Sequence, residues 1–170
     1  NGHAIDRLLS AHHARVGLQP QEPITPELWL RRVSFDLTGL PPSPEEVSAF
    51  LSDHAPDARS RAVDQLLASP QFGERWARHF MDLWRYADWW GLDQQLRYSQ
   101  KHIWHWRDWI VESLNSGRGL DRMIQEMLAA DELAPDDQAT LRATGFLCRP
   151  YYLFIRTTWL DEVVEHTSRA

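Results

Sequence analysis

The stretch that decides the fold is SPQFGERWARHFMDLWRYAD, residues 69–88. Ser69 followed by Pro70 is typical of a helix start, because serine caps the first amides and proline has no amide that would need a partner. Apolar residues then recur at helical spacing, so we expect a long helix that ends near Asp88. Its apolar stripe consists of Trp76, Phe80, Leu83, Trp84 and Ala87.

Helical spacing continues on both sides of this stretch, and caps, prolines and glycines divide it. Further helices are expected near residues 5–16, 26–39, 43–51, 57–68, 100–115, 120–128, 137–146 and 157–167. No alternation of apolar and polar residues is long enough to predict a strand. We therefore predict an all-α fold, an irregular orthogonal bundle of about eight or nine short helices. Residues 1–170 are expected to form a single helical domain, as a segment of a longer multidomain protein.

The composition indicates a globular domain and argues against nucleic acid as a partner. The chain is 43% hydrophobic and has a net charge of -6, whereas proteins that bind a duplex usually present a basic face. No apolar run approaches the roughly 18 residues that a membrane span needs. Because Cys148 is the only cysteine, an internal disulfide and a haem attachment through C-x-x-C-H are both excluded within this chain.

The long helix carries a polar row opposite its apolar stripe. Spacings of three or four residues let these side chains touch along one face. A histidine beside a carboxylate would suit an anion or polyol site, and a row of intrahelical ion pairs is the alternative interpretation. The candidate residues are Arg75, His79, Asp82, Arg85, Tyr86 and Asp88.

Two adjacent tryptophans, Trp89 and Trp90, fall in an expected loop after this helix. Exposed indole rings suit sugar stacking or a protein interface. The alternative is that one ring packs inside the domain and the other is partly exposed.

The next helix places Trp106 at a core position, while Trp109 shares another face with His102 and His105. We therefore expect Trp109 to contact a ligand, a neighbouring helix or another domain. Two histidines three residues apart need a third ligand to hold a metal, and none is evident, so no metal site is predicted.

Two acids, Asp131 and Glu132, lie at the expected end of a helix, where each opposes the helix dipole by about 0.3–1 kcal/mol. We expect an arginine from another helix to compensate, with Arg85 and Arg107 as candidates; Asp108 follows Arg107 directly. Such a network could be structural or could line a site, and the structural role is the favoured interpretation.

Six motifs occur in a fixed order along the chain. They are VSFDLTGLPPSPEEVSAFL (33–51), LLASPQFGERWARHFMDLWRYAD (66–88), WRDW (106–109), LAADEL (128–133), ATGF (143–146) and WLDEVVEHTSRA (159–170). Together they resemble the second planctomycete cytochrome C domain, a family of unknown function, over residues 5–170. Domains of this family occur in large exported bacterial proteins that often carry a separate c-type cytochrome module.

The resemblance implies a periplasmic or cell-surface location and partners among the other domains of the same chain. In the family the last helix typically runs on into a C-x-x-C-H stretch, and this chain ends before it. Haem c is therefore expected in the parent protein and not in this segment. The resemblance makes His166, followed by His79, the candidate for the second axial ligand.

Three functions are compatible with these features. The first is a helical domain of an exported cytochrome-c-associated protein that scaffolds a downstream haem c in electron transfer, with a redox partner. The second is a carbohydrate-binding or glycan-processing domain with polysaccharide as its partner. The third is a structural or interaction module. The sequence identifies no catalytic residue and assigns no reaction.

Overall fold

The computed structural model describes residues 3–87, 102–148 and 156–169 of the chain. All regular structure within these ranges is helical, which confirms the predicted all-α class. The elements are α1 (Ala4–Val16), α2 (Pro26–Thr38), α3 (Pro44–Ser52), α4 (Ala58–Leu67), α5 (Pro70–Leu83), α6 (Trp104–Asn115), α7 (Leu120–Leu133), α8 (Gln138–Leu141), the 3-10 turn η2 (Arg142–Thr144), α9 (Gly145–Cys148) and α10 (Arg156–Arg169).

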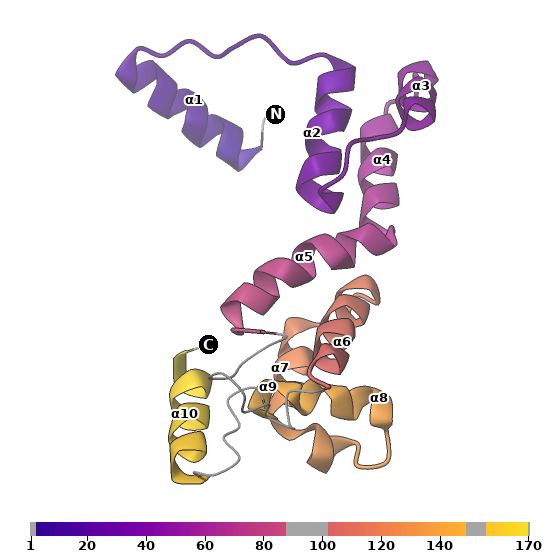
Figure 1. The fold of residues 1–170 in the computed structure, drawn as a ribbon. Coiled ribbons are helices and arrows are strands. Elements are labelled where there is room, and N and C mark those ends of the chain that lie inside the picture. Colours follow the sequence, from indigo (N-terminus) through magenta and orange to yellow (C-terminus); the bar gives the residue numbers. More distant parts are fainter. Residues whose placement is uncertain (1–2, 88–101, 149–155, 170) are drawn as a thin grey trace.

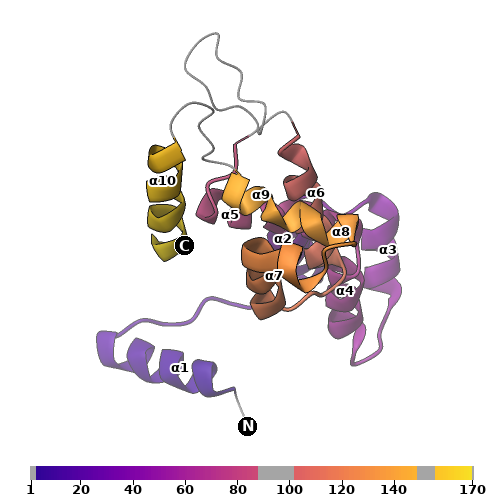
Figure 2. The ribbon, with the colours of Figure 1, turned by 90° about the horizontal axis from the view of Figure 1, so that it is seen from below.

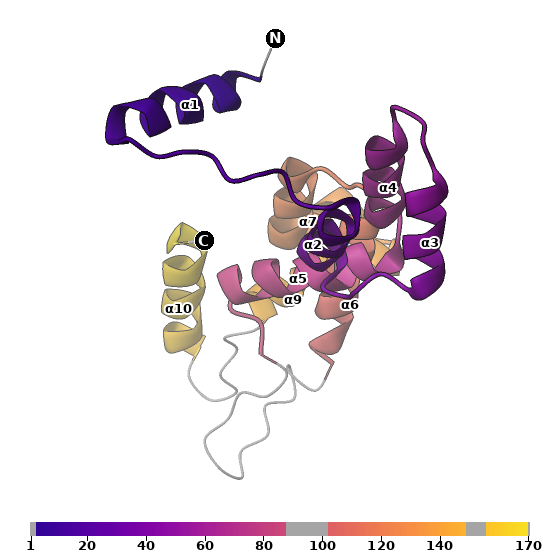
Figure 3. The same ribbon diagram turned by 90° about the horizontal axis from the view of Figure 1, so that it is seen from above.

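Helix α5 connects two groups of helices (Figure 1). Helices α2, α3 and α4 lie at its start, and α6 to α9 gather around its other side. The most extensive packing in the described residues joins α5 to α6, and α5 also packs against α2. The terminal helices lie at the periphery, and α1 stands apart from the other helices in every view (Figure 2, Figure 3).

The helix starts follow the caps that the sequence predicts. The Thr25 hydroxyl accepts a bond from the Leu28 amide (3.4 Å) at α2. At α3, the Ser43 hydroxyl and the Glu46 carboxylate each accept from the other residue's amide, which is a capping box. Ser69 differs, because its hydroxyl donates backward to the carbonyl of Leu66 (2.8 Å) and does not cap α5.

Helix α5 ends at Leu83, earlier than the sequence predicts. Arg85 has a φ of 57°, which lies in the left-handed region. The Arg85 amide donates to the Asp82 carbonyl (3.3 Å), and the Tyr86 amide donates to the Met81 carbonyl (2.8 Å). These two bonds form a Schellman motif, in which the left-handed position is usually glycine. Because the chain leaves the helical path here, the residues that follow no longer keep helical spacing.

The buried face of α5 is narrower than the predicted stripe. Gly73, Ala77 and Trp84 are buried, whereas Trp76 and Leu83 are exposed. Gly73 has no side chain and Ala77 has only a methyl group, so a neighbouring helix can come close along these two positions and not along the largest residues.

One asparagine fixes the contact between α5 and α6. The Asn115 side chain accepts from the Gly73 amide (2.8 Å) and donates to the Pro70 carbonyl (3.0 Å). A Cβ on Gly73 would lie 2.4 Å from the Asn115 Oδ1 atom. Glycine at this position therefore leaves room for the amide group that ties the two helices together.

The main core lies between α5, α6, α7 and α9. Trp106 is buried there as predicted, with its ring 6.4 Å from that of Trp84 and 5.8 Å from that of Phe146. Trp109 is 1% exposed and lies in this core with Met123 and Met127 of α7. Of the three contacts that the sequence leaves open, this burial fits the neighbouring helix and not a surface that binds a ligand or another domain. The core comprises Ala77, Trp84, Ile103, Trp106, Trp109, Ile110, Met123, Met127, Ala130, Ala143 and Phe146.

Substitution of Gly73 by alanine tests the contact between α5 and α6. Alanine favours a helix by about 1 kcal/mol over glycine, so a free helix would gain stability. We expect the variant instead to lose about 1–3 kcal/mol of unfolding free energy in urea denaturation, because Asn115 must give up both of its hydrogen bonds. In the double variant with Asn115→Ala, the two losses should not add, since the colliding amide is gone. Additive losses would contradict this description of the contact.

Candidate functional site

The described residues of the predicted polar row on α5 lie in different surroundings. Arg75 is half-buried, and its Nε atom has no hydrogen-bond partner among the described residues. His79 is exposed, with its ring 5.4 Å from that of Trp76, and Asp82 is exposed as well. Tyr86 turns inward instead, with its ring 5.8 Å from that of a core tryptophan. The Schellman motif causes this separation, because Tyr86 lies beyond the end of the helix.

Several other predicted residues can be placed only in part. Arg85 is exposed at the left-handed position after α5. Asp88, Trp89 and Trp90 lie outside the described residues, as does the side chain of His166 on α10.

The two acids at the end of α7 are not joined to the arginines that the sequence suggested. Asp131 and Glu132 are exposed, and the ion pairs seen among the described residues include neither. Arg107 bonds its neighbour Asp108, with 3.0 Å between Nε and Oδ1. Water solvates the two exposed carboxylates, so the fold has no buried charge to compensate there.

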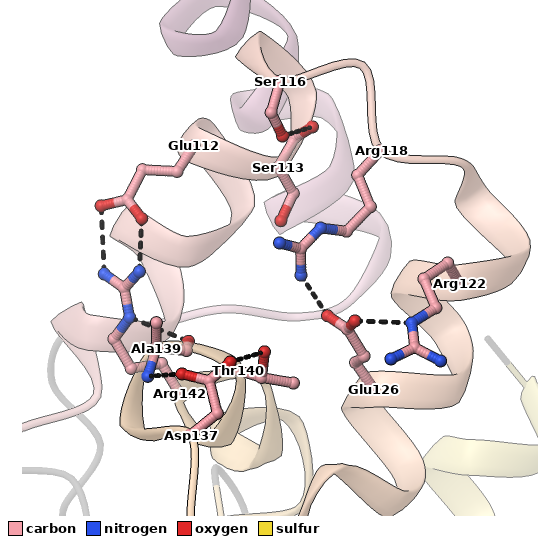
Figure 4. Close-up of polar contacts among 10 residues, drawn as sticks. All are labelled: Glu112, Ser113, Ser116, Arg118, Arg122, Glu126, Asp137, Ala139, Thr140 and Arg142. Carbon is pink, nitrogen blue, oxygen red and sulfur yellow. Dashed lines mark hydrogen bonds and ion pairs between the residues drawn. The ribbon is translucent and has the colours of Figure 1, made fainter. Parts of the chain in front are cut away.

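A buried carboxylate that the sequence analysis overlooked lies on α7 (Figure 4). Glu126 is 3% exposed and is bonded by the guanidinium groups of Arg118 and Arg122, the latter at 2.7 Å. The Arg118 guanidinium also lies over the Trp109 ring, 5.6 Å from its centroid. The spacing of four residues between Arg122 and Glu126 is a visible signal, but nothing in the sequence shows that the carboxylate is buried.

A second ion pair crosses from α6 to η2 (Figure 4). Both nitrogens of the Arg142 fork bond the two oxygens of Glu112, one pair at 3.0 Å. These hydrogen bonds hold the pKa of the Glu112 carboxyl below its usual value. Nearby, Asp137 caps α8 by accepting from the Ala139 amide (3.0 Å), and its side chain also accepts from the Thr140 hydroxyl (2.6 Å).

An open cavity of about 640 Å³ lies where the start of α6 meets α8 and α9. His102, His105, Trp106, Arg142 and Cys148 are among its lining residues, and the two imidazole centroids are 6.2 Å apart. Arg142 is already occupied by its ion pair. In the part of the chain that the structure describes, no three histidine, cysteine or acidic side chains gather to hold a metal. The cavity lining thus combines two imidazole rings with a thiol, a hydroxyl group and apolar side chains.

A smaller cavity of about 390 Å³ lies between α2, α3 and α4. Its lining includes Ser34, Glu46, Asp53 and Arg61, and Arg61 forms an ion pair with Asp53. The backbone amide of Ala55 bonds the Asp53 carboxylate and lowers its pKa. The polar groups at this rim thus serve to cap and connect α3 and α4.

In a comparison with protein families, the model of PSCyt2, described as a protein of unknown function (DUF1549), matches residues 4–170. The chain belongs to the PSCyt2 family. This is the second planctomycete cytochrome C domain family that the six sequence motifs resemble. Neither a curated protein nor a solved structure matches this PSCyt2 domain.

The residues of this PSCyt2 domain do not fit covalent haem attachment. Haem c is bound through two thioether bonds and a histidine in a C-x-x-C-H motif, and the chain has one cysteine. Cys148 lies at the end of α9 beside the cavity that His102 and His105 also line. Separately, no helix among the described residues is both long and apolar enough to cross a membrane.

The Glu112–Arg142 pair predicts a pH-dependent stability. A lowered carboxyl pKa stabilises the fold above the unfolded value, near 4.5, and this contribution is lost as the pH falls through the folded pKa. We expect Glu112→Gln to cost up to about 1 kcal/mol at neutral pH, since water screens the exposed carboxylate. The difference from the unmodified domain should shrink as the pH falls below about 4.5.

Chemical denaturation at a series of pH values measures this difference. Glu74→Gln on α5 is the control, because Glu74 is exposed and should change stability by less than about 0.5 kcal/mol at neutral pH. A cost for Glu112→Gln that stays constant down to acidic pH would contradict the expected linkage.

Proposed function

We propose that this PSCyt2 domain is an interaction module of a longer exported protein, and that it packs against a domain of that protein that carries haem c for electron transfer. The observation behind this proposal is that the terminal helices present apolar faces to solvent. On a soluble domain, contiguous apolar surface marks a place where another molecule or domain binds.

Helix α1 gives the clearest case. It has no buried residue, and its apolar side chains are 49–73% exposed. An isolated helix of this length is only marginally stable in water, because most helical stability in proteins comes from packing an apolar face. The helix therefore needs a surface to pack on. The exposed apolar residues are Ile5, Leu8, Leu9 and Val16.

Helix α10 repeats the pattern at the other end of the chain. Leu160 and Val164 lie four residues apart on one face, and Val164 is 69% exposed. The indole of Trp159 donates to the Leu147 carbonyl (3.3 Å), which connects α10 to the end of α9. The helix is thus attached by one side and leaves an apolar face open on another.

The polar groups of the described residues support an interaction role over a catalytic one. Glu126 and Glu112 are used in ion pairs between elements of the fold, and Asp137 is used as a helix cap. A general acid or base needs a titratable group aimed at a substrate position, and these carboxylates are aimed at arginines and amides of the domain itself.

In this proposal the haem is bound by a neighbouring domain and not by this one. The single cysteine rules out covalent attachment within this chain, so the haem of an exported cytochrome would be held by residues elsewhere in the longer protein. The carbohydrate-binding alternative rests on Trp89 and Trp90, which lie outside the described residues, and it stays a sequence prediction.

Amide hydrogen exchange tests the interaction role. The 170-residue domain and the longer protein are compared, and we expect the amides of α10 to exchange at least about tenfold more slowly in the longer protein. Helix α6, which lies in the core, is the internal reference and should not change. Equal exchange from α10 in both proteins would refute the proposed packing.

A visible absorption spectrum tests the haem part separately. The longer protein, matured in a host that assembles c-type cytochromes, should show a Soret band and sharp reduced-state bands. The 170-residue domain, matured in the same host, should be colourless because it lacks a second thiol. A colourless longer protein that is folded would remove electron transfer from the proposal and keep only the interaction role.

A further inference from the structure

We infer that this domain associates with a second copy of itself, and that α1 of each copy packs on the outer face of α7 in the other. This inference rests on the proposed interaction role and names the partner for two of the exposed surfaces. It leaves the apolar face of α10 for a neighbouring domain.

The outer face of α7 presents exposed apolar side chains in the body of the domain. Met123 and Met127 point into the core, whereas the apolar residues on the adjoining face stay 40–48% exposed. These exposed residues recur every four positions, which matches one stripe of a helix. They are Leu120, Ile124 and Leu128.

The exposed stripe of α1 suits this face in kind. Helix α1 has 13 residues, and α7 has 14 with a kink at Ala129, so the exposed stripe of α7 lies on the straight part before that residue. Both carry aliphatic side chains at spacings of three or four, which can interdigitate as ridges and grooves when two helices pack. Packing them together would remove both stripes from water in one step.

The charges of the two helices are complementary. Helix α1 carries two arginines, Arg7 and Arg15, against one acid, and two histidines lie beside Arg15. Helix α7 carries three exposed acids against Arg122, since Glu126 is buried in its own ion pairs. The acids Asp131 and Glu132 follow a kink of α7 at Ala129, where φ is -149°, and lie near its C-terminal end, while Arg15 lies near the C-terminal end of α1. With the two helices parallel, these acids would gain a basic partner, which they lack among the described residues.

The linker favours a partner in a second copy over the same chain. Residues 17–25 contain Gly17, Pro20 and Pro23, and proline keeps such a segment extended and stiff. In the structure this linker holds α1 away from the other helices, and α7 of the same chain is left uncovered (Figure 2, Figure 3). In a two-fold symmetric dimer the contact between α1 and α7 occurs twice, so the apolar stripes of both helices are buried in both copies.

Sedimentation velocity of the 170-residue chain, from micromolar to submillimolar concentration, tests the association. We expect a dimer, and we expect Leu8→Glu on α1 and Ile124→Glu on α7 each to raise its dissociation constant at least about tenfold. Ala14→Glu is the matched control, because it adds the same charge to α1 on the face opposite the stripe. A monomer at every concentration, or a dimer that neither variant weakens, would overturn the inference.

Charge reversal tests the parallel arrangement. Arg15→Glu and Glu132→Arg should each weaken the dimer, and the double variant should recover most of the loss. Losses that add in the double variant would overturn this arrangement of the two helices.

Disulfide trapping separates a second copy from the same chain. In a Cys148→Ser background, Leu9→Cys with Leu128→Cys should oxidise to a species of twice the mass on a non-reducing gel. A cross-link confined to the monomer would overturn the inference, because α1 would then pack on its own chain. If the longer protein is monomeric and still protects α10, the proposed interaction role stands and the self-association fails.

Discussion

The contact between the Gly73 amide and the Asn115 side chain fixes how α5 crosses α6, and the rest of the domain follows from that crossing. Helix α5 leads from the first group of helices to the second, so any change in this angle would move one group against the other. Glycine and alanine at the crossing let α5 and α6 approach each other closely. The large rings of Trp84 and Trp106 can therefore pack together next to the crossing.

Charged residues among helices α6 to α9 also hold elements of the fold together. Glu126 holds the loop arginine Arg118 over Trp109, and Glu112 holds η2 to α6 through Arg142. A buried carboxylate with two arginine partners specifies one arrangement of these elements, since any other would leave the charge unpaired. The polar groups around this core thus act within the domain.

Apolar side chains are treated differently in the core and at the surface. The central helices bury theirs against one another, whereas α1, α10 and the outer face of α7 leave apolar side chains exposed to water. The domain thus has a closely packed centre and terminal helices whose apolar faces are open, and we propose that these helices pack on other domains or copies. The proposed role follows from this division.

The sequence by itself determined the all-α class, the helix starts at Thr25 and Ser43, and the core position of Trp106, because caps, prolines and helical spacing are local signals. It could not determine where α5 ends, because the left-handed residue that ends this helix is Arg85, and the usual sequence signal for such an end is a glycine. It left open which element Trp109 contacts and overlooked Glu126, because helical spacing defines the faces of a helix but not which face meets another helix. Burial of those two side chains depends on how the helices pack around them, and only the tertiary structure decided that.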